Sequence, residues 1–306
     1  MFHVKLELES VPICPVCQGK NFGVEVKCVD ELVSKAHFSI VECANCGLRL
    51  TSPRPSRNTI GQFYKSDQYV SHSDSKRGFI HWIYHIVRSI ALRQKLSYIR
   101  HFSNGARLLD FGAGSGGFVS FMTDNGYDCV GVEPDADARS VASLKYNIEL
   151  QDPSILDDTR GLQAFDVVTM WHVLEHTHDP LDLLARLRAI INNDGLLVVA
   201  VPNYKSKDAQ TYKSNWAAYD VPRHLFHFST DSLTKAATLS GFSIDKIIPM
   251  RFDAYYVSML SEKNIGGNIL KGIINGFLSN ANARFGNSEY SSLIYILRPL
   301  KPYKAT

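Results

Sequence analysis

The amino-acid sequence predicts an α/β protein with a doubly wound, mainly parallel sheet, preceded by a small cysteine-containing module. Three observations support this fold class. From Ala106 onward, short apolar or β-branched runs alternate with helix-like segments, which is typical of buried parallel strands joined by helices. A glycine-rich turn follows the first of those runs. Four of the six cysteines form two C-x-x-C pairs near the N-terminus.

Composition and punctuation divide the 306 residues into three parts. Residues 1–52 hold the cysteine turns and short strand-like pieces, and the prolines of Ser52-Pro53-Arg54-Pro55 end this module because consecutive prolines restrict the backbone. Residues 53–103 have a helical pattern and form a linker or lid. Residues 104–306 form the large domain, in which 203–229 is polar, aromatic and too long for an ordinary loop, as expected of a functional lid.

The large domain should contain strands and helices in alternation. We expect strands at Arg107–Phe111, Cys129–Val132, Asn147–Leu150, Phe165–Met170, Leu196–Val201, Ser243–Met250 and Ser291–Arg298. The helices should lie at Phe118–Asn125, Ala136–Tyr146, Pro180–Ile191 and Thr230–Ser240, with an amphipathic stretch at Ile265–Leu278. This alternation of strands and helices predicts the doubly wound α/β class.

The charge and hydropathy of the chain exclude several protein classes. A formal net charge of +3 does not indicate an electrostatic nucleic-acid binder. The first residues lack the basic start and apolar stretch of a signal peptide, and no run approaches the roughly 18 apolar residues that span a bilayer. We therefore expect a soluble protein of a reducing, cytoplasmic compartment. Phe79–Leu92 and Ile265–Leu278 could contact a membrane, but such helices are more often packed against the protein, so membrane contact is not favoured.

The glycine-rich turn is the most informative motif. Gly112, Gly114 and Gly117 satisfy G-x-G-x-x-G, so a dinucleotide-binding dehydrogenase is an alternative to a site for S-adenosylmethionine (SAM). Two acids favour SAM. Asp110 ends the first strand, where a dinucleotide-binding strand normally stays apolar, and Glu133 ends the second strand, where it can accept both ribose hydroxyls.

Four ordered motifs carry a family resemblance: LLDFGAGSG, VGVEPD, FDVVTMWHVLEH and GLLVVAVPN. Together they resemble the class I SAM-dependent methyltransferases of the ubiquinone O-methyltransferase-like branch, over roughly residues 104–245. The resemblance implies a Rossmann-like sheet of seven strands, the last antiparallel, with SAM over the carboxyl ends of the first strands.

The resemblance also implies the cofactor-binding residues. Gly112 and Gly114 would line the methionyl group with Asp110 behind them, Glu133 would hold the ribose, and the loop near Asp152 would face the adenine. The complete set of implied SAM-binding residues is Asp110, Gly112, Ala113, Gly114, Gly116, Glu133, Pro134, Asp152, Trp171 and His172. For His176, bracing a helix and taking part in the site are equally open.

The two C-x-x-C pairs predict a structural zinc site. Cys14, Cys17, Cys43 and Cys46 would supply four thiolates to a tetrahedral Zn²⁺ in a zinc-ribbon-like module. A module of some 50 residues is hard to stabilise without such a staple. Iron in a rubredoxin-like site and a redox dithiol pair remain alternatives. Residues 18–42 between the pairs exceed the common spacing of about 15–20, which a longer hairpin would absorb.

The lid contains the candidate catalytic residues. Moving a methyl group to oxygen or carbon requires an aligned acceptor and, in many cases, a base. His224 is the first candidate base and His227 the second. Tyr219 and Arg223 could bind a hydroxylated or anionic acceptor. Three linker residues could close over the site from the other side: Tyr64, Tyr69 and His72.

The acceptor class depends on the N-terminal module. A cysteine module ahead of this domain resembles the zinc-containing sugar C-methyltransferases, and some ribosomal RNA methyltransferases carry a zinc ribbon in the same place. Residues 1–60 hold seven Lys or Arg and six Asp or Glu, so this module is not a basic nucleic-acid surface. We expect a small-molecule acceptor, such as a sugar or glycan precursor, with methylation of rRNA or tRNA as the alternative. The sequence does not indicate an oligomeric state.

Overall fold

The computed structural model describes residues 7–64, 79–159 and 163–300, and for 79–88 the backbone alone. Tyr69 and His72, two of the predicted linker contacts, lie outside the described residues, as do the side chains of the first part of Phe79–Leu92. Within the described residues, no helix combines the length and apolarity that a membrane crossing requires.

The centre of the large domain is a six-stranded sheet in the order β11-β12-β9-β8-β6-β7. Strands β6, β7, β8 and β9 run parallel, and β12 is antiparallel to both of its neighbours, β9 and β11. This arrangement confirms the predicted doubly wound class and the antiparallel last strand. The strands are β6 Arg107–Phe111, β7 Asp128–Val132, β8 Phe165–Trp171, β9 Ile191–Pro202, β11 Phe242–Pro249 and β12 Ser292–Pro299.

The strand expected at Asn147–Leu150 is reduced to one bridge beside β7. Asn147 ends the preceding helix in the left-handed conformation, with φ of 55°, and Asp152 caps the next short helix. Between these two turns only Gln151 forms a parallel bridge, to Val132. The seventh position of the sheet is therefore occupied, but by a single residue pair.

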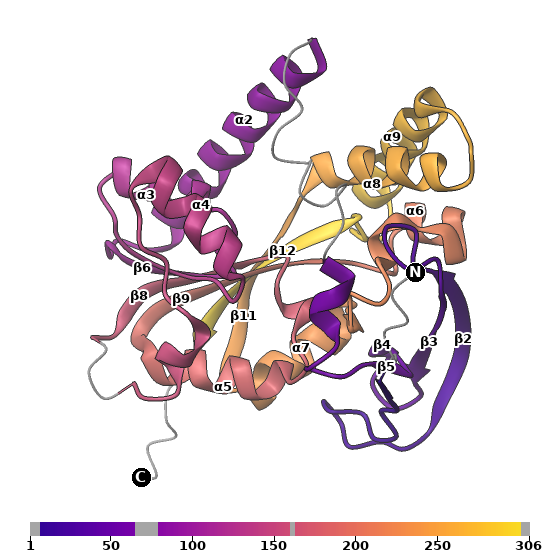
Figure 1. Cartoon of the computed structure of the whole chain (residues 1–306), viewed down its shortest axis with the longest axis horizontal. Helices are drawn as coiled ribbons and strands as arrows, with labels where there is room; N and C mark the ends of the chain where they lie inside the picture. Colours follow the sequence, from indigo (N-terminus) through magenta and orange to yellow (C-terminus); the bar gives the residue numbers. More distant parts are fainter. Residues whose placement is uncertain (1–6, 65–78, 160–162, 301–306) are drawn as a thin grey trace.

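Helices cover both faces of the sheet (Figure 1). Helices α2, α3 and α4 lie on one face, and α5 and α7 lie on the other. In α5 the buried residues Leu183, Leu184, Leu187 and Ile190 recur at helical spacing and face the sheet. The helices are α2 Phe79–Phe102, α3 Gly117–Asp124, α4 Ala136–Tyr146, α5 Pro180–Ile190, α6 Lys207–Tyr212, α7 Thr230–Leu239, α8 Arg251–Asn264 and α9 Ile269–Phe285.

The cysteine module and the predicted lid share one sheet. Strands β2 Phe22–Val29, β3 His37–Cys43 and β4 Arg49–Thr51 pair antiparallel, and β10 Phe226–His227 adds to the edge of β4. A separate two-stranded ribbon joins β1 Leu8–Glu9 to β5 Arg54–Pro55. Leu50 of the module and Phe226 of the lid belong to the same buried cluster as the central sheet, so the module packs directly on the large domain (Figure 1).

The segment 203–229 contains helices and a strand that its sequence pattern did not predict. It contains α6, the short 3₁₀ helices η4 Lys213–Asn215 and η5 Ala217–Tyr219, and β10. The other 3₁₀ helices are η1 Ile60–Tyr64, η2 Pro153–Leu156 and η3 Leu174–His176. Most of this segment is buried between the cysteine module, η3 and α8.

Candidate functional site

The glycine turn between β6 and α3 adopts backbone conformations that require glycine. Gly112 and Gly114 have φ of 80° and 53°, where side chains are disfavoured. A Cβ on Gly112 would lie 2.3 Å from Val173 Cγ2, whereas a Cβ on Gly114 would have no atom of the described residues within 4 Å. The turn is thus packed on one side at Gly112 and open at Gly114, as a cradle for a ligand would be.

Glu133 closes the turn from the end of β7. Its Oε2 accepts a hydrogen bond of 2.8 Å from the Gly114 N–H, and its Oε1 accepts one of 3.0 Å from the Asp135 N–H. Glu133 is buried, and burial raises its pKa despite these two bonds. A carboxylate oxygen can accept more than one hydrogen bond, so Glu133 can still bind the hydroxyls of a ribose.

Asp110 lies behind the turn. It is buried, and Thr169 Oγ1 donates a hydrogen bond of 2.6 Å to its Oδ1. Burial raises the pKa of Asp110 to about 7. The neighbouring Ala113 N–H donates to Val132 O, so backbone bonds from β7 fix the turn above Asp110.

The other residues implied for SAM surround the same turn. Asp152 caps η2 through Ser154 N–H and lies 3.3 Å from Arg139 Nη1. Arg139 also donates to the carbonyl of Pro134 at 2.9 Å. Gly116 has φ of 78° and precedes α3. The Arg139 contacts connect the loop that follows β7 with the loop that follows the bridge at Gln151, at the carboxyl edge of the sheet.

Trp171 ends β8 beside the turn. Its ring lies edge-on to Phe118 with ring centroids 5.7 Å apart, and the Lys95 ammonium lies 4.0 Å from its ring centroid. The buried indole Nε1 has no hydrogen-bond partner among the described residues. A buried donor without a partner is costly. Together with the open side of Gly114, it fits a site that completes its hydrogen bonds when a ligand is bound.

His172 follows Trp171 in a left-handed conformation, with φ of 57°. Its Nε2 lies 3.2 Å from Asp253 Oδ2 and its Nδ1 lies 3.4 Å from Glu175 Oε1. Burial alone would lower its pKa, but the carboxylates of Asp253 and Glu175 raise the pKa to about 10. His172 is therefore held between the carboxylates of Asp253 on α8 and Glu175 on η3.

Glu175 is the centre of a polar cluster. It is buried, and neither carboxylate oxygen has a hydrogen-bond partner among the described residues besides the His172 ion pair. Burial favours its neutral form, yet the neighbouring histidines His172 and His224 hold its pKa below the usual value. Glu175, His176 and His224 each offer one ligand atom within 4.8 Å of the others. This donor set can hold a proton or a divalent cation.

His224, the first candidate base, has a defined tautomer. Its Nδ1 lies 2.8 Å from the carbonyl oxygen of Ala218, and because a carbonyl only accepts, Nδ1 carries the hydrogen. A neutral His224 therefore keeps its lone pair on Nε2. Its ring meets that of His176 edge-on, with centroids 4.5 Å apart. Tyr64, the described member of the predicted linker contacts, lies 2.9 Å from His176 Nδ1 through its hydroxyl.

Three other lid residues contact the cysteine module. His227 Nε2 lies 3.1 Å from Thr51 Oγ1, and Tyr219 accepts a hydrogen bond of 2.8 Å from Arg49 Nη1. Arg223 donates to Asp220 and, through Nη1, to Asp30 and the carbonyl of Phe63. The rings of Tyr219 and His227 lie edge-on, 5.2 Å apart. The structure thus brings Tyr219, His224 and His227 together, but Tyr219 and His227 bond to module residues.

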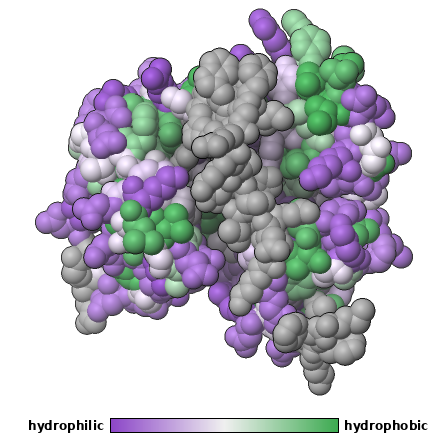
Figure 2. All heavy atoms as spheres, turned by 45° about the horizontal axis from the view of Figure 1, so that its top comes forward, coloured by the Kyte–Doolittle hydropathy of each residue, from purple (hydrophilic) through white to green (hydrophobic). Residues whose placement is uncertain are grey.

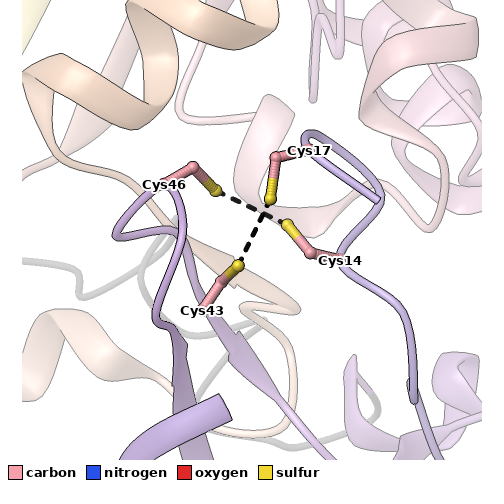
Figure 3. Close-up of side chains that lie close together, drawn as sticks. All are labelled: Cys14, Cys17, Cys43 and Cys46. Atoms are coloured by element: carbon pink, nitrogen blue, oxygen red, sulfur yellow. Dashed lines mark hydrogen bonds between the residues drawn. The ribbon is translucent and has the colours of Figure 1, made fainter. Parts of the chain in front are cut away.

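The four predicted zinc ligands converge at one point (Figure 3). The Sγ atoms of Cys14 and Cys46 are 3.6 Å apart, those of Cys17 and Cys43 are 3.4 Å apart, and all four lie within 4.8 Å of one another. A tetrahedral site with Zn–S bonds of about 2.3 Å separates its sulfurs by about 3.8 Å. The donor set therefore fits a tetrahedral thiolate site. Cys28 and Cys129 lie outside this cluster and have pKa values raised by burial.

The thiols of the cluster respond differently to their surroundings. Burial raises the pKa of Cys14 to about 11 and also raises that of Cys46. Burial opposes ionisation of Cys43 as well, but the N–H groups of Asn45 and Cys46 and the Cys17 thiol lower its pKa to about 7. Backbone donors directed at a sulfur stabilise a thiolate, the form that binds metal.

Comparison with known proteins decides the family. Residues 81–247 match the family described as methyltransferase domain, which is more than half of the chain. The chain belongs to this family. The resemblance drawn from the four motifs is confirmed, and the dehydrogenase alternative is set aside. The fold of the methyltransferase domain is similar to that of magnesium protoporphyrin IX methyltransferase from Synechocystis, with a TM-score of 0.52 and 12% identity over 80% of this chain and 100% of that one.

Sequence relatives of the methyltransferase domain have different acceptors. It is 30% identical over 144 residues to a ubiquinone biosynthesis O-methyltransferase of Bradyrhizobium, covering 43% of this chain and 56% of that protein. It is 37% identical over 102 residues to a tRNA U34 carboxymethyltransferase of Dichelobacter nodosus, covering 31% of this chain and 32% of that protein. The chain thus spans about half or less of the length of these relatives.

Two partners of the candidate site residues were missed from the sequence. Asp253, in the first turn of α8, contacts His172, and Asp30, in the cysteine module, contacts Arg223. Neither belongs to a motif. The only sequence signal at Asp30 is local: its side chain accepts from the N–H groups of Leu32, Val33 and Ser34, as a turn-forming aspartate does.

Proposed function

We propose that this chain transfers a methyl group from SAM to a carbon or oxygen of a small-molecule acceptor. SAM supplies a methyl group already activated by its sulfonium centre. The relatives named ubiquinone biosynthesis O-methyltransferase support a small-molecule acceptor. The resemblance to zinc-containing sugar C-methyltransferases makes sugars and glycan precursors the first acceptors to test.

The residues at the carboxyl edge of the sheet are suited to bind SAM. The open face of the turn at Gly114 can receive the methionyl part, and Glu133 can accept the ribose hydroxyls. Trp171 can direct toward the ligand its Nε1–H, which has no partner in the described parts of the chain. Asp110, near the end of β6, lies behind the turn and accepts a hydrogen bond from Thr169.

The tautomer of His224 is the observation that carries the catalytic proposal. With Nδ1–H donated to Ala218 O, Nε2 is free to remove a proton from an acceptor hydroxyl or from a carbon next to a carbonyl. The acceptor oxygen or carbon then forms its bond to the methyl carbon while the methyl–sulfur bond breaks. His224 becomes an imidazolium, and the buried carboxylate of Glu175 stabilises that charge.

The cluster of Glu175, His176 and His224 also supports a positioning role for Glu175. Its carboxylate would lie beside the imidazolium that His224 forms when it accepts the proton. We therefore assign His224 as the base and Glu175 as the group that raises its effectiveness. His227 and Tyr219 would act indirectly, by fixing the lid on the module through Thr51 and Arg49.

An activity assay on two histidine variants tests the proposal. Formation of S-adenosylhomocysteine would be followed with a panel of nucleotide sugars and small phenols as acceptors. His224→Ala should lower turnover by roughly 10²–10⁴-fold while SAM affinity is unchanged. His227→Gln is the matched control, for which we expect a much smaller loss. Wild-type turnover in His224→Ala would remove His224 as the base.

The same assay distinguishes an RNA acceptor from a small-molecule acceptor. Purified tRNA and rRNA would be offered alongside the small molecules, at low and high salt. Methylation of RNA, with binding that weakens steeply as salt rises, would replace the small-molecule proposal. Absence of RNA methylation together with turnover of a panel member would support it.

A further inference from the structure

Helices α8 and α9 form a hairpin with its large apolar side chains on the outside. The side of α9 against α8 carries small residues: Gly272, Gly276, Ser279 and Ala283 are all buried. A Cβ on Gly272 would lie 2.7 Å from Met259 Cα, and a Cβ on Gly276 would lie 2.7 Å from Tyr255 Cα. The two helices therefore touch backbone to backbone, and no large side chain of α9 is needed to hold the hairpin together.

The opposite side of α9 is exposed and apolar. Its side chains are 42–66% exposed and recur at helical spacing, which places them on one continuous face. We call this the α9 apolar face: Ile269, Leu270, Ile273, Ile274, Phe277 and Leu278. With Phe252, Tyr256, Ile265 and Phe285, the hairpin holds ten of the eighteen large apolar residues exposed among the described side chains. Figure 2 shows this hydrophobic area at the upper right.

The exposed charges of the hairpin, residues 251–285, have one sign. Arg251, Lys263, Lys271 and Arg284 are exposed, whereas the hairpin has only two acids. Asp253 is directed to His172 and is 23% exposed, and Glu262 is fully buried, where it accepts from Tyr212 and lies 3.5 Å from Lys271 Nζ. The exposed side of the hairpin therefore combines apolar side chains with cations and presents no exposed acid.

We propose that the α9 apolar face docks on an anionic lipid surface. A helix that presents Leu, Ile and Phe on one side and Lys and Arg at its margins inserts its apolar side at the headgroup boundary, where anionic lipids attract the cations. A second copy of this chain is a poorer partner, because two such faces would bring their cationic margins together with no exposed acid to pair them. In this arrangement the hairpin lies on the surface of the bilayer.

The position of the hairpin connects this surface to the candidate active site. Asp253 in the first turn of α8 lies 3.2 Å from His172 at the end of β8. A protein docked through α9 would therefore hold its site close to the lipid headgroups. This position suits an acceptor that is itself embedded in, or attached to, a lipid.

Vesicle co-sedimentation of the full chain tests the docking surface. Vesicles of phosphatidylcholine alone would be compared with vesicles that also contain phosphatidylglycerol. We expect binding to the anionic vesicles, weakened by salt. The double variant Ile273→Ser, Phe277→Ser should lower the partition coefficient by roughly tenfold or more. Leu144→Ser, at a 90% exposed leucine on α4, is the matched control and should bind like wild type.

Further measurements separate the outcomes. Lys263→Gln with Arg284→Gln should weaken binding and reduce its salt dependence, and retained SAM binding in every variant would show that the fold and the cofactor site are intact. Wild-type protein that stays unbound with both vesicles would overturn the proposal, as would equal loss in Leu144→Ser. A dimer in light scattering that Ile273→Ser, Phe277→Ser converts to a monomer, without vesicle binding, would assign the face to a second copy instead.

Discussion

Arg223 donates a hydrogen bond of 3.1 Å from Nη1 to Oδ1 of Asp30, joining residues that are 193 positions apart in the sequence. The two side chains are 1% and 0% exposed. Burial alone would raise the pKa of Asp30, but the N–H and hydroxyl of Ser34 and the Arg223 charge hold it below its usual value. This buried pair ties the cysteine module to the segment that carries His224.

Breaking the buried pair should destabilise the fold. Asp30→Ala removes one of the two carboxylates that pair with the buried guanidinium of Arg223. Because this charge is shielded from water, we expect the free energy of unfolding to fall by about 3–5 kcal/mol. Urea denaturation followed by circular dichroism measures the change. Glu31→Gln is the control, because its partner Lys35 is 65% exposed, and such pairs contribute about 0–1 kcal/mol. Similar losses in both variants would show that the Asp30 pair has no special role.

The cysteine cluster should bind zinc and support the fold. We expect one Zn²⁺ per chain by elemental analysis, lost in Cys43→Ser but retained in Cys28→Ser, whose thiol lies outside the cluster. Chelation should lower the melting temperature, because a small module without its metal loses the cross-link between its two cysteine pairs. It should also loosen the lid, since the Tyr204 hydroxyl donates to the carbonyl of Gly47 beside Cys46 at 2.5 Å. Bound iron, or thiols that cycle with a reductant, would favour the alternatives.

SAM binding should depend on Glu133. Glu133→Ala removes the acceptor of the Gly114 and Asp135 N–H groups together with the expected ribose contact. A charged hydrogen bond contributes about 1.5–3 kcal/mol, so isothermal titration should show SAM affinity lowered by roughly 10–100-fold. The exposed acid Glu149 offers a control, Glu149→Ala, with unchanged affinity. Binding of NAD in place of SAM would mean that the glycine turn holds a dinucleotide.

Stability should fall on the acid side of neutrality because of His176. Burial, and then the charge of His224, lower its pKa from 6.5 to about 4. The unfolded chain therefore binds a proton more readily than the folded one between these values. The contribution of neutral His176 is complete above about pH 6.5 and is lost as the pH falls through about 4. Denaturation curves from pH 7.5 to 4.5 should show a smaller decline in His176→Asn, and identical pH dependence would contradict the assignment.

Local patterns were sufficient for the fold class and for part of the site. The glycine turn, Glu133 at a strand end and the two C-x-x-C pairs each depend on a few neighbouring residues, because a turn conformation or a strand end is decided by local backbone sterics. The strand predicted at Asn147–Leu150 is absent for a local reason too. Asn147 adopts the left-handed conformation, and only Gln151 forms a bridge to β7.

The long-range pairs were decided by tertiary structure alone. His227 with Thr51, Tyr219 with Arg49 and Arg223 with Asp30 all join the lid to the module across more than 160 residues. No periodicity encodes such contacts, because they exist only where the lid packs against the module.

The sequence by itself therefore determined which chemical groups this protein has: a methyltransferase glycine turn, a four-cysteine cluster and two histidines in one segment. The tertiary structure decided which of them meet. Packing of the module against the lid places Tyr219 and His227 on module residues and leaves His224 beside Glu175, because the buried polar groups of the lid must each find a partner.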